Sequence, residues 1–187
     1  MNYFDLTNSQ LLIWTGQQLT PDSPHYNMGF AFEFRNKIDA LKFELAFSQL
    51  VKDTEILRSI FVTVDDQPRM VVRDIVDYNF GHFSMNLDDA HTWMNQQIRT
   101  VFNITEQVFA TALFKHSEEH YTWYFNQHHL ITDGWAFTLL YEKLMSIYLD
   151  KDKFQDTPLP LSQQITVKDH SQENKYWKNL LTTGEEN

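Results

Sequence analysis

The sequence predicts an α+β fold in which a mixed or antiparallel sheet packs against helices. Segments of helical and strand-like periodicity interleave along the 187 residues. Short polar turns join two pairs of strand-like segments, which indicates hairpins rather than crossovers alone. Hydrophobic residues make up 42% of the chain and aromatic residues 15%, enough apolar side-chain mass for a packed core. We expect one domain, or two small lobes, without internal repeats.

The first three elements are expected to be a helix, a strand and a second helix. Polar capping groups in front of Leu11 predict a helix over residues 8–19. Residues 26–35 alternate between large apolar side chains and smaller or polar ones, which predicts a strand with one buried face. Asp39 is a candidate cap for the next helix. That helix is expected to bury Leu41, Leu45, Phe47, Leu50 and Val51.

Two hairpins are expected in the middle of the chain. Residues 56–64 are rich in β-branched side chains, and a polar turn separates them from residues 70–72. Residues 108–114 and 121–125 flank a second polar turn at 117–119. We expect this second hairpin to form the centre of the sheet.

Three further helices complete the expected fold. Helical spacing of apolar residues predicts a helix over 88–102, and apolar side chains around most of the segment 135–149 predict another. A polar connection that contains prolines follows at 151–164. The last expected helix covers residues 169–181, with Tyr176, Trp177 and Leu180 facing inward.

Composition and charge exclude several classes of function. The chain has no cysteine, which rules out disulfide scaffolds, thiolate zinc sites and cysteine nucleophiles, and the cytosol is the expected compartment. A net charge of −10 gives the surface the wrong sign for a nucleic-acid partner. The N-terminus lacks the pattern of a signal peptide, and no apolar run reaches the roughly 18 residues of a membrane span. No membrane partner is therefore expected.

Residues 126–134 are the strongest candidate for chemistry. His128 and His129 end a predicted strand, and Asp133 and Gly134 precede a predicted helix. At least one imidazole should thus lie at an element end, where a pocket can form. Successive side chains on a strand point to opposite faces, so one histidine can face a cavity while the other packs inward. A neutral imidazole can accept a proton near pH 7. The alternative is a structural histidine pair followed by a simple helix cap.

The spacing of these residues is more informative than their identities. The segment His-His-Leu-Ile-Thr-Asp-Gly at 128–134 resembles HHxxxDG, the hallmark motif of the condensation domains of nonribosomal peptide synthetases. A related motif occurs in the wider group of chloramphenicol acetyltransferase-like acyltransferases. The resemblance implies that the fold is a chloramphenicol acetyltransferase-like lobe, with a mixed sheet packed against helices.

Two further segments resemble motifs of the same family, in the expected order. Residues 7–14 are similar to SxAQxR(L/M)W and keep Gln10 and Trp14, with Leu12 where arginine is usual. Residues 55–61 match the second half of RHExLRTxF, although the leading Arg-His pair is absent. These departures concern the subtype and leave the histidine motif intact.

The resemblance covers all 187 residues but only the first half of a condensation domain. Residues 176–181 resemble the helix that closes the family's N-terminal lobe. We therefore expect residues 1–187 to be an N-terminal lobe without its C-terminal lobe, inactive alone, with an apolar interlobe face that favours self-association. With Met1 as the native start, the donor would come from another polypeptide or from a soluble acyl thioester.

The resemblance implies a role for each site residue. His129 would be the catalytic residue and would accept a hydrogen bond or a proton from the attacking amine, while His128 would pack and position. Asp133 would hold the loop, either by pairing with Arg58 or by capping the following helix. Gly134 would let the backbone or a pantetheine arm approach closely.

The implied reaction is peptide-bond formation between a donor acyl or peptidyl thioester and an acceptor aminoacyl amine. The expected partners are the carrier-protein domains that hold both substrates on phosphopantetheine, together with the C-terminal lobe. No cofactor or metal is expected to bind the chain directly, because its other histidines lack metal-ligand spacing. Trp135 is expected either in the core or in the wall of the pocket.

Three alternatives remain open at this level. A freestanding acyltransferase of the same fold would use acyl-CoA or a carrier-bound donor. An epimerisation domain carries a similar HHxxxDG motif. A non-catalytic lobe that docks carrier proteins would keep the histidines only as relics. The reading frame beyond Asn187 would discriminate among them.

Overall fold

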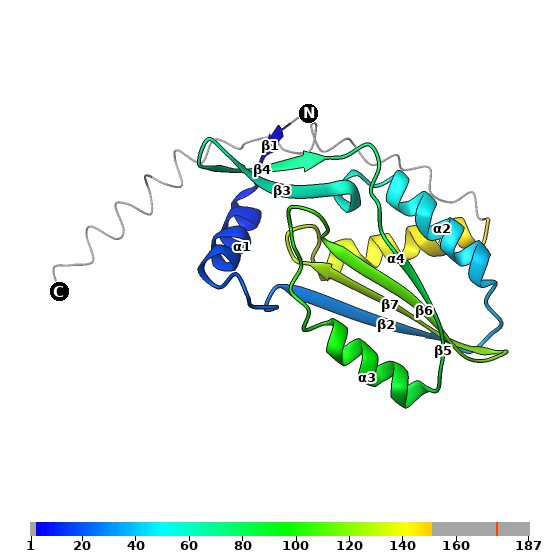
Figure 1. The fold of residues 1–187 in the computed structure, drawn as a ribbon. Helices are drawn as coiled ribbons and strands as arrows, with labels where there is room; N and C mark the ends of the chain where they lie inside the picture. The colour runs from blue at the N-terminus through cyan, green and yellow to red at the C-terminus, as the bar shows by residue number, and fades with distance from the viewer. Residues whose placement is uncertain (1–2, 151–174, 176–187) are drawn as a thin grey trace.

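The computed structural model describes residues 3–150 and Lys175, and its helices and strands interleave around two sheets (Figure 1). The predicted α+β class is confirmed. The segments expected at 151–164 and 169–181 lie outside the described residues, apart from Lys175. The elements are β1 (Tyr3–Asp5), α1 (Asn8–Leu19), β2 (Asn27–Phe34), α2 (Ala40–Lys52), η1 (Glu55–Arg58), β3 (Ser59–Val64), β4 (Gln67–Val72), β5 (Phe80–Ser84), α3 (Leu87–Gln97), β6 (Phe109–Ser117), β7 (His120–His128) and α4 (Gly134–Tyr148).

The larger sheet has the strand order β2-β7-β6-β5. Strand β7 pairs antiparallel with both β2 and β6, whereas β5 runs parallel to β6, so the sheet is mixed. The β6–β7 hairpin lies at its centre, as predicted. The last residue of β7, His128, lies opposite Asn27 of β2.

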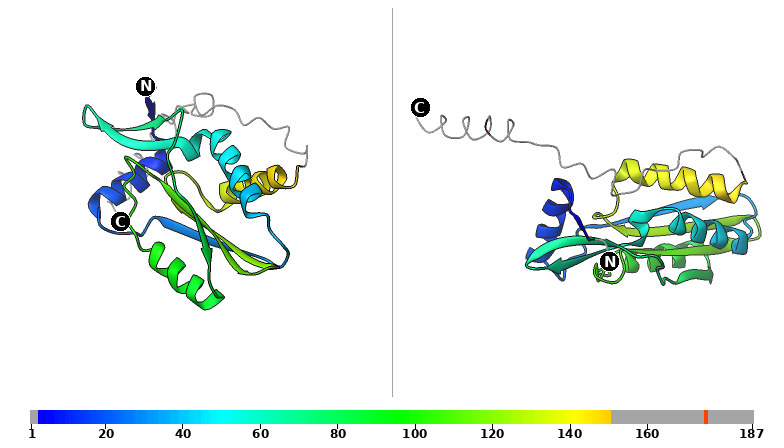
Figure 2. Two further views of the ribbon diagram at one scale, coloured as in Figure 1. Left: turned by 45° about the vertical axis from the view of Figure 1, so that its right-hand side comes forward. Right: turned by 90° about the horizontal axis from the view of Figure 1, so that it is seen from above.

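Helices cover both faces of this sheet (Figures 1 and 2). On one face Trp123 of β7 meets Phe43 of α2 and Phe137 of α4, with ring centroids 5.7 and 6.5 Å apart. The next residue, Tyr124, points to the other face and meets Trp93 of α3 at 5.8 Å, because successive strand side chains alternate. None of the helices in the described part of the chain is long and apolar enough to span a bilayer.

Helix α2 buries a different face from the one that the sequence predicts. Leu41 and Leu45 are 66% and 61% exposed, so the prediction for these two residues was wrong. Consecutive residues are about 100° apart on a helix, which places both leucines opposite Phe43. The contacts of Phe43 and Phe47 with Trp123 select the buried face. That face consists of Phe43, Ala46, Phe47, Leu50 and Val51.

The smaller sheet has the order β1-β4-β3 and contains the first predicted hairpin. Strand β3 begins at Ser59 rather than at residue 56, because Glu55–Arg58 form the 3₁₀ helix η1. Helix α3 ends at Gln97, before the predicted end at residue 102. The sequence does not predict β1 and β5, because strands of 3 and 5 residues are too short to show a clear periodicity.

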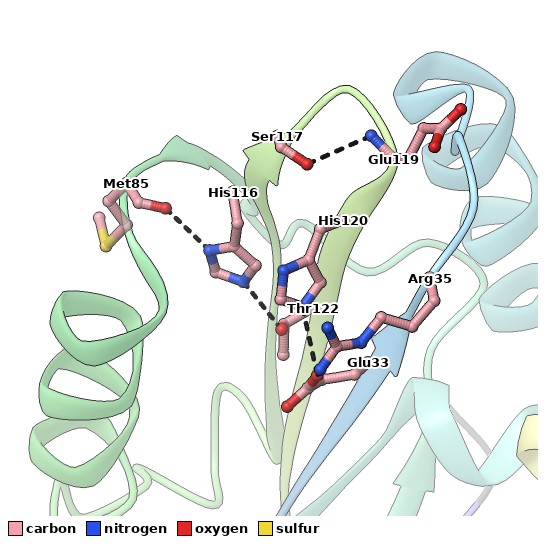
Figure 3. Close-up of polar contacts among 8 residues, drawn as sticks. All are labelled: Glu33, Arg35, Met85, His116, Ser117, Glu119, His120 and Thr122. Atoms are coloured by element: carbon pink, nitrogen blue, oxygen red, sulfur yellow. Dashed lines mark hydrogen bonds and ion pairs between the residues drawn. The ribbon is translucent and has the colours of Figure 1, made fainter.

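Two histidines at the turn of the β6–β7 hairpin have structural partners (Figure 3). Both ring nitrogens of His116 form hydrogen bonds, Nδ1 to the carbonyl of Met85 at 2.8 Å and Nε2 to a threonine hydroxyl at 2.9 Å. The Nε2 atom of His120 lies 3.2 Å from a carboxylate oxygen of Glu33. Because β7 starts at His120 and ends at His128, this cluster lies at the opposite end of the strand from the paired histidines.

Candidate functional site

The paired histidines lie where the central strand β7 ends. His128 is its last residue and α4 begins at Gly134, so the predicted strand-to-helix loop exists, but it covers residues 129–133 rather than 126–134. His128 is only 1% exposed, whereas His129 is half-buried. The loop therefore presents the second histidine, and not the first, to an approaching group.

A hydrogen bond selects one tautomer for the neutral ring of His129. Its Nδ1 atom lies 2.7 Å from the carbonyl oxygen of Thr132. A carbonyl oxygen can only accept, so Nδ1 carries a hydrogen, and in the neutral ring Nε2 therefore carries the lone pair. The backbone N–H of His129 donates to the carbonyl of Tyr26 at 2.8 Å, which ties the loop to the chain in front of β2. This is the tautomer that can accept a proton at Nε2.

The ring of His128 lies inside the molecule and forms two hydrogen bonds. Its Nε2 atom lies 3.2 Å from the side-chain oxygen of Gln17, and its Nδ1 atom accepts from the backbone N–H of Leu130, also at 3.2 Å. Burial lowers the pKa of His128 from 6.5 to about 4, and the neighbouring His129 acts in the same direction. His128 is therefore neutral at pH 7 and adds no charge beside His129.

The low pKa of His128 predicts a loss of stability in acid. An unfolded histidine binds its proton near pH 6.5 and the folded one only near pH 4. The unfolded state therefore binds more protons between these values, so the free energy of unfolding should fall as the pH drops from 6.5 to 4 and level off below. Through His128 alone, the free energy of unfolding should fall by about 3 kcal/mol in total over this pH range.

Urea unfolding between pH 4 and pH 7 checks this expectation, with His128→Gln as a variant that lacks the titrating group. The free energy of unfolding of the variant should depend less on pH over this range. A direct titration of the His128 ring by NMR gives the same information. A measured pKa close to the unperturbed histidine value of about 6.5 would contradict the expectation.

Asp133 caps helix α4. Its side chain accepts a hydrogen bond from the backbone N–H of Ala136 at 2.7 Å, which confirms the cap as one of the two roles expected for it. Its other expected role, an ion pair with Arg58, is absent among the described residues. Arg58 instead donates to the carbonyl of Arg73, which links η1 to the end of β4. The first N–H groups of α4 lie next to Asp133 in the chain, so its carboxylate forms the helix cap rather than an ion pair with Arg58.

The start of α4 is open. A side chain added at Gly134 would meet no described atom within 4 Å, and the backbone there does not adopt a positive φ. Neither steric crowding nor a tight turn thus explains this glycine.

Trp135, the next residue, is 73% exposed. Of the two places expected for it, the core was therefore the wrong one. Within residues 3–150, no group of three or more histidine or acidic side chains is placed to bind a metal ion.

Two glutamines of α1 hold the same loop. Gln10 closes a capping box with Thr7 at the start of the helix and donates from Nε2 to the carbonyl of Leu130 at 3.0 Å. The motif resemblance includes Gln10. Gln17 was missed, because no local pattern relates a residue of α1 to His128, which lies 111 positions later.

The whole chain is similar to one known family. The family model of the condensation domain matches residues 2–187. The chain belongs to the condensation domain family. Bacitracin synthase 3 from Bacillus licheniformis is 27% identical over 96% of this chain, and isonitrile lipopeptide synthase from Streptomyces coeruleorubidus is 31% identical over 73%. The chain spans 3% and 10% of the length of these two relatives.

Solved condensation domains share the fold of this one. A variant of the starter condensation domain of rhizomide synthetase superimposes with a TM-score of 0.82 at 22% identity, over 100% of this chain and 49% of that structure. The first condensation domain of the CDA synthetase gives 0.76 at 23% identity, over 84% of this chain and 42% of that structure. The expected condensation-domain fold is confirmed, and the chain spans less than half the length of either structure.

Proposed function

We propose that residues 1–187 are the N-terminal lobe of a condensation domain and supply its catalytic histidine for peptide-bond formation in nonribosomal peptide biosynthesis. The observation that supports this is the state of His129, whose Nδ1 donates to the Thr132 carbonyl and whose Nε2 is therefore the proton-accepting atom. Of the two histidines of the HHxxxDG motif, His129 is the one that the fold leaves partly exposed.

In the proposed reaction, the amine of a carrier-bound acceptor attacks the thioester carbon of a carrier-bound donor. A C–N bond forms, the C–S bond breaks, and the donor carrier keeps the sulfur as a thiol. His129 takes a proton from the attacking nitrogen at Nε2 and can return one to the leaving thiolate. Much of the rate would come from holding the two substrates in line and from stabilising the tetrahedral oxyanion.

The remaining site residues have supporting roles in this proposal. His128 positions the loop from inside, and Asp133 fixes the direction of α4 through its cap. Arg58 joins η1 to the end of β4. Gly134 leaves space at the start of α4 for the pantetheine arm of a carrier domain.

The proposed partners are two carrier domains and a second lobe. The chain spans 49% of the starter condensation domain that it matches, which leaves room for another lobe of similar size. Trp135 and Leu139 are large apolar side chains that stay exposed beside the site. They are four residues apart and so share one face of α4, which would be covered in the complete domain.

A second candidate uses acyl-CoA as the donor in place of an acyl-carrier. A variant of the starter condensation domain of rhizomide synthetase, 27% identical to this chain with a TM-score of 0.75, was solved in complex with C8-CoA. That structure supports a soluble acyl thioester as donor for this chain as well. The acceptor amine and the role of His129 would be the same.

The test uses the intact protein that contains residues 1–187. It is mixed with an aminoacyl-carrier acceptor and with either an acyl-carrier or an acyl-CoA donor, and the acceptor carrier is analysed by mass spectrometry. An amide product with the carrier-bound donor supports the proposal, and a product with acyl-CoA alone supports the second candidate. Hydrolysis without amide formation, or epimerisation of the acceptor, would contradict both.

Gly134 offers a prediction that separates function from folding. Gly134→Ala and Gly134→Leu should leave the free energy of unfolding unchanged or raise it by up to about 1 kcal/mol, because the space is open and glycine is a poor helix former. Amide formation should fall with side-chain size, by roughly tenfold or more for leucine, because the pantetheine arm would be displaced. Chemical unfolding and steady-state rates are the measurements. An unchanged rate of amide formation in Gly134→Leu would show that the pantetheine arm does not pass Gly134.

A further inference from the structure

We propose that Gln17 is a positioning residue of the catalytic loop, because it holds His128 in the neutral Nε2–H tautomer and through it the backbone that carries His129. This inference rests on the proposed function for its kinetic consequence. Its structural part, the tautomer of His128, stands on the contacts alone.

The orientation of the Gln17 side chain is determined by its surroundings. Gln17 is only 5% exposed, and its amide nitrogen lies 3.1, 3.1 and 3.2 Å from the carbonyl oxygens of Thr20, Pro21 and Ser23. A flipped amide would place its oxygen against these three acceptors. The oxygen of Gln17 must therefore point toward His128, 3.2 Å away.

An oxygen acceptor at this place determines the tautomer of His128. The amide oxygen of Gln17 can only accept, so the Nε2 atom of His128 must donate. In the neutral ring Nδ1 then carries the lone pair, and it accepts from the backbone N–H of Leu130 at 3.2 Å. The opposite tautomer would set two N–H groups against each other at Leu130 and leave two buried acceptors facing each other at Gln17.

Leu130 is the residue through which this bond reaches His129. Its N–H is held by His128 and its carbonyl by the side chain of Gln10, 3.0 Å away. Both sides of the residue next to His129 are thus anchored. Gln10 and Gln17 are seven residues apart, which places them on one face of α1 two turns apart. Helix α1 therefore braces the loop at two points.

The experiment uses the intact protein and compares Gln17→Met with Gln18→Met. Methionine has a similar length but no hydrogen-bonding amide, and Gln18 is an exposed neighbour on the same helix. The two readouts are the kcat and KM of amide formation and the ¹⁵N NMR signals of His128 at pH 8. We expect Gln17→Met to lower kcat by about tenfold with little change in KM, because the loop but not the carrier surface is disturbed. Gln18→Met should match the unmodified protein.

The NMR result is independent of the reaction. In the unmodified protein the Nε2 of His128 should show the signal of a protonated nitrogen, and in Gln17→Met this preference should be lost. A protonated Nδ1 in the unmodified protein would overturn the inference, and so would an unchanged kcat in Gln17→Met. Absence of amide formation by the unmodified protein would instead refute the proposed function and leave the tautomer result standing.

Gln17→Glu keeps the test decisive where Gln17→Met fails to fold. The three carbonyls that face one of its oxygens favour the protonated carboxyl group, which can donate to one of them. Its other oxygen still accepts from the Nε2–H of His128. We expect it to retain the protonated Nε2 and to have a higher kcat than Gln17→Met, or a measurable kcat where the methionine variant has none. Loss of the protonated Nε2 in Gln17→Glu, despite a folded protein, would overturn the inference.

Discussion

Replacing His129 with alanine in the intact protein is expected to lower the rate of amide formation by about 10²–10⁴-fold. The half-buried ring has its Nε2 lone pair available for the proton of the attacking amine, and alanine has no group to replace it. Stability should fall by only about 1 kcal/mol, because the side chain forms one hydrogen bond, to Thr132, within the described part of the chain. Single-turnover amide formation and chemical unfolding measure the two quantities.

Asp133 provides the matched control for this prediction. Asp133→Asn keeps a good N-cap for α4 and removes the charge, whereas Asp133→Ala removes the cap and should cost about 1 kcal/mol of stability. Full activity in Asp133→Asn is expected if the cap is the only role of this residue. A stable but inactive Asp133→Asn would place the carboxylate in the reaction. Near-full activity in His129→Ala would show that His129 takes no part in the reaction.

The largest loss of stability is expected from Trp123→Ala, about 3–5 kcal/mol. Trp123 is completely buried in the central strand β7 and packs against aromatic side chains of α2 and α4. Its indole N–H donates to the hydroxyl of Thr111 at 2.9 Å, so the substitution leaves a cavity and removes a buried hydrogen bond. A loss of this size approaches the whole stability of a typical domain.

Trp135→Ala is the control, because it deletes the same side chain from an exposed position at the start of α4. In the chain of residues 1–187 alone, its free energy of unfolding should stay within about 0.5 kcal/mol of that of the unmodified chain. Urea unfolding of both variants, followed by circular dichroism, is the measurement. Equal losses in the two variants would show that the core is not centred on the Trp123 face of β7.

Local sequence patterns predict most of the framework that carries the site. Helix α1, strand β2 and the β6–β7 hairpin follow from capping residues, alternation and a polar turn, all within short segments. The cap by Asp133 belongs to the same class, since its partner Ala136 is three residues away. Alternation along an extended chain predicts that His128 and His129 point to opposite sides. Which of the two is buried depends on the fold, because residues on both faces of β7 are buried up to His128 and the half-buried His129 lies in the loop that follows.

Other features depend on which elements meet in space. The face of α2 that is buried follows from its contacts with Trp123, and a helical pattern with apolar residues on several sides leaves that choice open. The partner of Arg58 is a backbone carbonyl at the end of β4 rather than Asp133. The short strands β1 and β5 form only because β4 and β6 offer them an edge to pair with.

The residues and spacing of the histidine motif are thus properties of the sequence, and so is the chemistry that an imidazole can perform. The tautomer that each imidazole adopts when neutral is a property of the folded chain. Gln17 contacts His128, which lies 111 positions later in the sequence, and Gln10 donates a hydrogen bond to Leu130, which lies 120 positions later. Such contacts exist only after α1 has packed beside the end of β7, because they join side chains whose distance is set by the fold and by no local periodicity.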